Sequence, residues 1–121
     1  MILDMIAKAV ERHGVKVIVF RGEANVDAIK DLAFQIKGES NSDEKVFFVA
    51  GIKDGAKCAL MVMLSEPLVA EGLNAGKLVK DAAKLIQGGG GGQAHFATAG
   101  GKNSDGLAQA VEQILEAADL K

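Results

Sequence analysis

Apolar residues recur along this chain with two different spacings, and the change from one spacing to the other marks the predicted elements. A spacing of three and four residues covers residues 2–13 and 26–36, which is typical of helices with one buried face. Gly14 would end the first helix, and Asn25 would cap the second. Residues 15–20 form a short and nearly continuous apolar run, which predicts a buried strand between these helices.

Two further apolar runs, residues 46–52 and 57–64, flank the dipeptide Asp54-Gly55. Asp-Gly between apolar runs is a strong signal for a β-hairpin. Both runs are apolar at almost every position rather than at alternate positions. We therefore expect a sheet that is covered on both faces, at least at its centre.

The second half of the chain returns to helical spacing. Ser65 and Asn74 are suitable N-caps, the first for a short helix and the second for a helix over residues 75–86. Residues 96–99 predict a short strand between glycines, and the apolar pattern of residues 107–118 predicts a final helix.

This order of elements predicts the α/β class: a single compact domain with a mixed central sheet, helices on both faces and a glycine-rich loop between a helix and a strand. The first predicted helix begins at Ile2 with no N-cap before it, which suggests the end of a longer helix. We therefore divide the chain into residues 1–14, the end of an upstream helical segment, and residues 15–121, the globular domain.

Composition narrows the class of protein further. The 121 residues are 49% hydrophobic and 25% charged, which is ordinary for one globular domain. Asp4 stands where an export signal would carry bases, and no apolar run approaches the length of a membrane span. The sequence therefore predicts a cytoplasmic protein with no membrane partner. Cys58 is the single cysteine, which excludes an internal disulfide and favours a buried apolar role.

The most informative feature is the run of five glycines at residues 88–92. Glycine costs backbone entropy on folding, so such a run suggests that the backbone itself must approach something closely. Exposed backbone N–H groups bind anions, above all phosphate. Residues 73–102 carry four lysines and one aspartate, a charge of +3, whereas the whole chain carries −2. We interpret this segment as a local phosphate-binding site; a flexible linker is the alternative.

Neither common nucleotide-binding motif fits the glycine run. A P-loop needs Gly-Lys-Ser/Thr opening a helix after a strand, whereas Gln93 follows Gly92 here. A dinucleotide-binding motif needs its glycines between a strand and a helix, whereas this run follows a predicted helix.

The wider segment matches a known family. Asn74-Ala75-Gly76 leads into the helix, the five glycines and Gln93 follow, and His95-Phe96-Ala97-Thr98-Ala99-Gly100-Gly101-Lys102 completes the pattern. This segment resembles the C-terminal, DHH-associated domain of bacterial alanyl-tRNA synthetases, which is shared with the DHH phosphoesterases. One departure is Ala94, where the family pattern leads us to expect proline.

The resemblance implies a domain that binds tRNA(Ala), at the elbow of the tRNA, and is itself non-catalytic. The parent enzyme would be an alanine–tRNA ligase that uses ATP and magnesium and carries zinc in its editing domain. The catalytic and editing domains of the same chain would be its partners. An adjoining helical segment dimerises some members, so the resemblance also allows a homodimer. This chain shows no set of residues with the spacing of a catalytic or metal site.

The candidate RNA- or phosphate-binding residues lie in this one segment. Three of them have ordinary alternatives: a solvated helix face for Lys77 and Lys80, and packing beside Phe96 for His95. Phe96 suits the core better than a base-stacking role. The candidates are Lys77, Lys80, Gly88, Gly89, Gly90, Gly91, Gly92, His95, Gly100, Gly101 and Lys102.

Two other functions compete with tRNA binding. The chain would bind short oligonucleotides or mononucleotides if it were the substrate-binding module of a DHH phosphoesterase. It would form a tight dimer in isolation if the glycine segment packed against a second chain.

Overall fold

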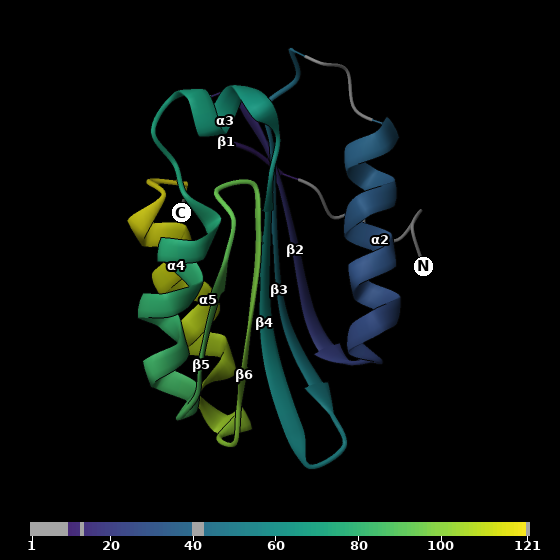
Figure 1. The fold of residues 1–121 in the computed structure, drawn as a ribbon, viewed down its shortest axis with the longest axis vertical. Helices are drawn as coiled ribbons and strands as arrows, with labels where there is room; N and C mark the ends of the chain where they lie inside the picture. Colours follow the sequence, from purple (N-terminus) through teal and green to yellow (C-terminus); the bar gives the residue numbers. More distant parts are fainter. Residues whose placement is uncertain (1–9, 13, 40–42, 121) are drawn as a thin grey trace.

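The computed structural model describes residues 10–12, 14–39 and 43–120 and shows a central sheet between two layers of helices (Figure 1). The six strands lie in the order β1-β2-β3-β4-β6-β5. They are β1 (Val10–Arg12), β2 (Val15–Glu23), β3 (Val46–Asp54), β4 (Lys57–Leu64), β5 (Gly89–Gly92) and β6 (Phe96–Gly101). The helices are α2 (Val26–Glu39), α3 (Glu66–Ala70), α4 (Ala75–Ala82) and α5 (Leu107–Ala117), with the short 3-10 helices η1 (Ala83–Ile86) and η2 (Ser104–Gly106).

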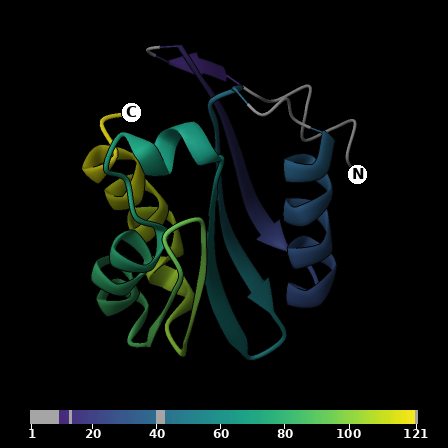
Figure 2. The same ribbon diagram turned by 45° about the horizontal axis from the view of Figure 1, so that its top comes forward.

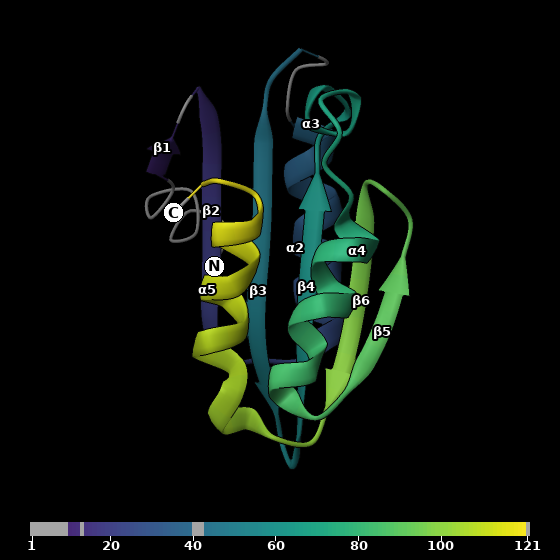
Figure 3. The same cartoon turned by 90° about the vertical axis from the view of Figure 1, so that its left-hand side faces the viewer.

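The sheet is mixed, as the sequence predicted. β2 and β3 are parallel, which requires a crossover, and α2 provides it. The other neighbouring strands are antiparallel. Helix α2 lies alone on one face of the sheet, whereas α4 and α5 lie on the opposite face (Figures 1 and 3). Figure 3 shows β5 at the edge of the sheet, beside β6 and next to α4.

Two hydrophobic cores, one on each face, account for the apolar runs. Alternate residues of β4 point to opposite faces, so Leu60 and Val62 join the core under α4 and α5. Met61 and Met63 join the core under α2. All four residues are fully buried. The expectation of a sheet covered on both faces is therefore confirmed.

Local signals placed most helix and turn boundaries correctly. The side chains of Asn25 and Asn74 accept hydrogen bonds from backbone N–H groups three residues later, at 3.1 Å each. Gly55 turns the β3–β4 hairpin with φ of +65°. Ser65 lies at the N-cap of α3, but its hydroxyl does not cap the helix; it accepts a hydrogen bond of 2.9 Å from the backbone N–H of Val46 instead.

The prediction of an N-terminal helix is wrong for the residues that the structure describes. Residues Val10–Arg12 form β1, which pairs antiparallel with the start of β2. Figure 2 shows this strand at the end of the sheet where α3 lies. Gly14, with φ of +80°, makes a turn between the two strands rather than a helix end. The rest of the predicted helix, residues 1–9 and 13, lies outside the described residues, and the division at residue 14 stays a prediction.

No helix within the described part of the chain is long and apolar enough to cross a membrane.

Candidate functional site

The glycine run is an edge strand rather than the loop that the sequence predicted. Gly89–Gly92 form β5, which pairs antiparallel with β6. Three residues, Gln93, Ala94 and His95, connect the strands, and the N–H of Gln93 donates to the carbonyl of Phe96 at 2.9 Å. Glycine has a low preference for strands, so the pairing with β6 and the contacts with α4 hold this segment extended.

One face of the glycine strand is crowded by its neighbours. A Cβ atom on Gly90 would lie 2.3 Å from the carbonyl oxygen of Thr98 and 2.5 Å from Cα of Ala99. A Cβ on Gly92 would lie 2.7 Å from the carbonyl oxygen of Phe96. A Cβ on Gly88 would likewise lie too close to the carbonyl oxygen of Gly100. These alternate glycines are therefore required for close packing and need no ligand to explain them.

The other face of the strand is open. A Cβ on Gly89 or Gly91 would meet no atom within 4 Å, and a Cβ on Gly100 would meet only the carbonyl oxygen of Cys58 at 4.0 Å. None of these three glycines has the positive φ that favours glycine. We call Gly89, Gly91 and Gly100 the open glycine face. Neither packing nor backbone conformation therefore requires glycine at these positions.

The strand register also orients the backbone N–H groups. In an antiparallel pair, hydrogen-bonded and non-hydrogen-bonded residue pairs alternate. Since Gln93 and Phe96 are hydrogen-bonded, Gly91 and Gly89 bond to β6, while the N–H groups of Gly90 and Gly92 point away from it. The N–H of Gly88 also points away and donates to the carbonyl of Ala83 at 3.0 Å. The N–H groups of Gly90 and Gly92 thus lie on the outer edge of β5, where Gly76 of α4 also packs close to the carbonyl oxygen of Gly92.

Three hollows lie along β6, and the first two are lined in part by residues of α2. The first, of about 340 Å³, contains Gly91 and His95, and the second, of about 400 Å³, shares Thr98 with it. The third, of about 350 Å³, shares Gly100 with the second and contains Lys102. We call this row the β6 groove. Its lining includes Lys30, Phe34, Asp54, Lys57, Cys58, Ala59, Gln87, Gly88, Gly91, Gly92, Gln93, His95, Phe96, Thr98, Gly100, Gly101 and Lys102.

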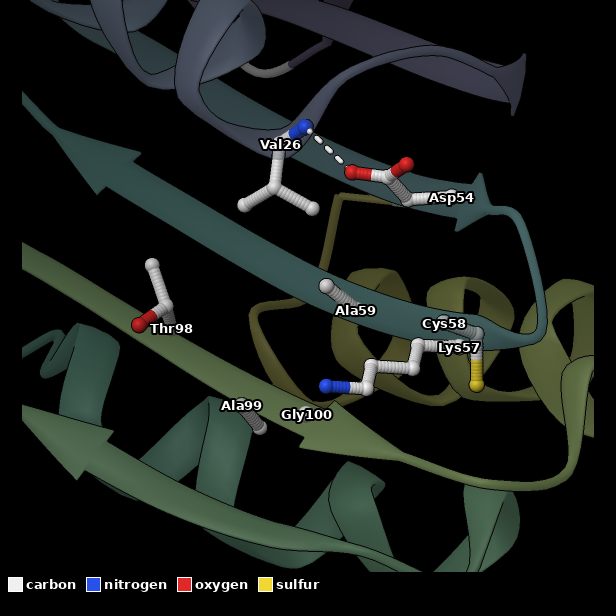
Figure 4. A pocket seen from close by; sticks show the side chains of 8 residues that line it. All are labelled: Val26, Asp54, Lys57, Cys58, Ala59, Thr98, Ala99 and Gly100. Carbon is white, nitrogen blue, oxygen red and sulfur yellow. Dashed lines mark hydrogen bonds between the residues drawn. The ribbon is translucent and has the colours of Figure 1, made fainter.

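The middle of the groove carries a cation. Lys57 is exposed, and its side chain extends from β4 across the groove toward β6 (Figure 4). The one carboxylate in this hollow, Asp54, lies at its far side and accepts a hydrogen bond of 3.2 Å from the N–H of Val26 at the start of α2. Together with Lys102 at the next hollow, Lys57 gives the groove a positive lining.

The structure brings most of the candidate residues together but separates two of them. Lys77 and Lys80 are exposed on α4, on the opposite face of the sheet, and line none of the three hollows. Gly101 is enclosed, because a Cβ there would lie 2.3 Å from the carbonyl oxygen of Ile86. Lys102 continues the groove, and its N–H donates to that same carbonyl at 2.9 Å.

His95 and Phe96 differ in their surroundings. The carbonyl of His95 accepts a 2.8 Å hydrogen bond from the N–H of Leu64, which fixes the turn, and His95 lines the first hollow. Phe96 packs against the core under α2 and on the ring of Phe34. The core interpretation of Phe96 is therefore confirmed, whereas a ligand role for His95 stays a prediction.

Sequence reasoning missed Lys30, Phe34, Lys57 and Thr98. Lys57 and Thr98 come to the groove through strand pairing between distant segments, which no local pattern reveals. The sequence did indicate that Phe34 would be exposed, because it falls outside the buried stripe of α2 formed by Ile29, Ala33 and Ile36. Among the described residues, no group of three or more His, Cys, Asp or Glu is placed to hold a metal ion.

Cys58 is expected to be unreactive although it borders the groove. Its side chain packs into the core under α4, and burial raises the pKa of the thiol, opposed in part by a backbone hydrogen bond at Gly101. A raised pKa means less thiolate at a given pH. At pH 8 we predict that a disulfide reagent labels the folded chain more slowly than the denatured chain, because the folded thiol is buried and less ionised. Equal rates would contradict this.

Comparison with known proteins gives a consistent result. A model of the DHHA1 domain family matches residues 14–120. The alanine–tRNA ligase of Parabacteroides distasonis is 58% identical over 118 residues, covering 98% of this chain and 13% of the relative. The alanine–tRNA ligase of Bacteroides thetaiotaomicron is 59% identical over 110 residues, covering 91% of this chain and 12% of the relative. The chain therefore spans about one eighth of the length of these relatives.

Solved structures share the fold. The C-Ala domain from Aquifex aeolicus alanyl-tRNA synthetase matches with a TM-score of 0.73 at 23% identity, covering 94% of this chain and 99% of that one. A DHH-domain protein described as a member of the s1p family of ribosomal proteins matches with a TM-score of 0.66 at 14% identity. The match covers 99% of this chain and 30% of that one. At these identities the likeness shows the fold alone.

Proposed function

The chain belongs to the DHHA1 domain family, and from that premise we propose that it is the tRNA-binding DHHA1 domain of an alanine–tRNA ligase. In this proposal the open glycine face and the β6 groove hold tRNA(Ala), at the elbow of the tRNA. The domain performs no chemistry of its own.

The open glycine face is the observation that carries the proposal. Gly89, Gly91 and Gly100 carry a conformational cost on folding, yet neither packing nor positive φ requires glycine there. A backbone without side chains allows a phosphate to reach N–H donors at the strand edge, which in β5 are those of Gly90 and Gly92. This face therefore suits a closely approaching anion.

Charge around the groove supports the same ligand. Lys57 and Lys102 line it, and Lys30 stands at its other end. The chain as a whole carries −2, so a positive groove on an acidic body favours a few defined phosphates over a whole duplex. Lys77 and Lys80 on α4 would contact RNA only if it wrapped around the β5 edge.

The reaction itself would take place elsewhere in the parent enzyme. Joining alanine to tRNA(Ala) would use ATP and magnesium at a catalytic domain, and an editing domain would hold zinc. This chain would contribute by holding one tRNA while both domains act on it. Association of two such chains stays a prediction.

A titration at several salt concentrations tests the proposal. The 121-residue chain is mixed with tRNA(Ala) and, separately, with a minihelix that contains the acceptor stem but no elbow. We expect binding to the full tRNA only, with a salt dependence equivalent to about three or four released phosphate counterions.

The alternatives predict different outcomes of the same titration. Equal affinity for both RNAs, or no binding, would overturn the elbow proposal. Affinity for short oligonucleotides without affinity for tRNA would favour a phosphoesterase-type substrate module. A tight dimer in sedimentation with no RNA binding would favour an oligomerisation module.

A further inference from the structure

Phe34 on α2 is an exposed aromatic ring at one end of the β6 groove. It is the one large hydrophobic side chain that is exposed among the described residues, with 44% of its surface accessible. Its ring lies on that of Phe96, with centroids 4.7 Å apart and planes tilted by 35°. Phe96 in turn packs against the core under α2. The inner side of Phe34 is therefore supported, and its outer side faces solvent.

The hollow beside Phe34 has the features of a nucleobase site. At about 340 Å³ it lies at the small end of the range for small-ligand sites, which is about 300–1,000 Å³. Gly91, Gln93 and His95 of the β5–β6 hairpin also line it. Side-chain amides and imidazoles hydrogen-bond the edges of bases, and aromatic rings stack on their faces.

Charge in this hollow favours a nucleotide over an apolar peptide. Lys30 stands one helical turn before Phe34 and lines the same hollow. None of the described residues that line it carries a carboxylate; the exposed acids of α2, Asp27 and Asp31, lie outside the lining. Thr98 connects this hollow to the next one, where Lys57 lies, so the lysines flank a path along β6.

We propose that this hollow binds one unpaired nucleobase of the RNA, stacked on Phe34, with a flanking phosphate at Lys30. The inference rests on the proposed RNA-binding function and adds to it a specific contact: the open glycine face takes backbone phosphates, while the Phe34 hollow takes a base. Stacking tolerates any base, so the contact contributes affinity and register rather than sequence specificity.

Fluorescence of a base analogue tests this contact. A tetranucleotide that contains one 2-aminopurine is titrated with the 121-residue chain, which has no Trp or Tyr to interfere. We expect binding to quench the analogue through stacking. Phe34→Ala should weaken binding at least about fivefold and abolish the quenching, since stacking on an aromatic side chain accounts for that much affinity per base. Phe34→Tyr should keep both.

Gln35→Ala is the matched control, because Gln35 is the exposed neighbour on the same helix and does not line the hollow. It should bind and quench as the wild type does. Thermal melting of each variant shows that its fold is intact; if Phe34→Ala melts early, Phe34→Leu replaces it.

The outcomes separate this inference from the proposed function. Binding of tRNA(Ala) by the wild type without quenching of the tetranucleotide, or with Phe34→Ala equal to the wild type, overturns the nucleobase site and leaves the proposed function standing. Quenching that depends on Phe34, without affinity for tRNA, supports the nucleobase site and overturns the tRNA proposal.

Discussion

Gly90→Ala is expected to lower the free energy of unfolding by about 3 kcal/mol, the upper end of the usual cost of overpacking. The added Cβ would lie 2.3 Å from the carbonyl oxygen of Thr98 and 2.5 Å from Cα of Ala99. Both are backbone atoms of β6, which is held on its other side by β4, so they cannot move aside as a flexible side chain would. Chemical denaturation of the 121-residue chain measures the change.

Gly89→Ala is the matched control for this prediction. The two glycines are adjacent in the same strand, but a Cβ on Gly89 meets nothing within 4 Å. We expect its stability to stay within about 0.5 kcal/mol of the wild type, as for surface positions in general. Similar losses for both variants would show that the two faces of β5 do not differ, and the division of the glycine run would be wrong.

The double variant Gly89→Ala/Gly91→Ala is expected to fold normally and to bind tRNA(Ala) at least about tenfold more weakly. Its two methyl groups would project from the open glycine face and keep phosphates away from the strand edge. A hydrogen bond to a charged group contributes about 1.5–3 kcal/mol. Loss of one such bond corresponds to about a tenfold to hundredfold loss of affinity.

Gly38→Ala provides a control of the same chemistry. Gly38 lies in α2, a Cβ there meets nothing within 4 Å, and the substitution does not touch the groove. It should leave affinity for tRNA unchanged. If the double variant bound tRNA as well as Gly38→Ala does, the open glycine face would not be the RNA contact.

The elements with local signals were predictable from the sequence. The Asp54-Gly55 hairpin and the Asn74 cap depend on neighbours within a few residues, and both lie where the sequence indicated. The two-sided burial of β3 and β4 followed from their lack of alternation. The sequence also indicated which segment holds the candidate site, because a cluster of glycines and lysines can be recognised without knowledge of the fold.

The organisation of the site was not predictable, since it depends on pairing between distant segments. Glycine has little strand preference, so nothing local indicated that Gly89–Gly92 would be a strand. The division into crowded and open glycines follows from the register Gly90↔Ala99 and Gly91↔Thr98, which only the sheet defines. Lys57 comes to the groove in the same way, through the pairing of β4 with β6.

Backbone amide signals of the labelled chain, followed by NMR as tRNA(Ala) is added, test the central claim most directly. The account predicts that the largest changes occur at Gly89–Gly92 and Gly100, with little change along α5 on the opposite face. Binding with unchanged glycine signals, and with changes confined to Lys77 and Lys80 of α4, would contradict it.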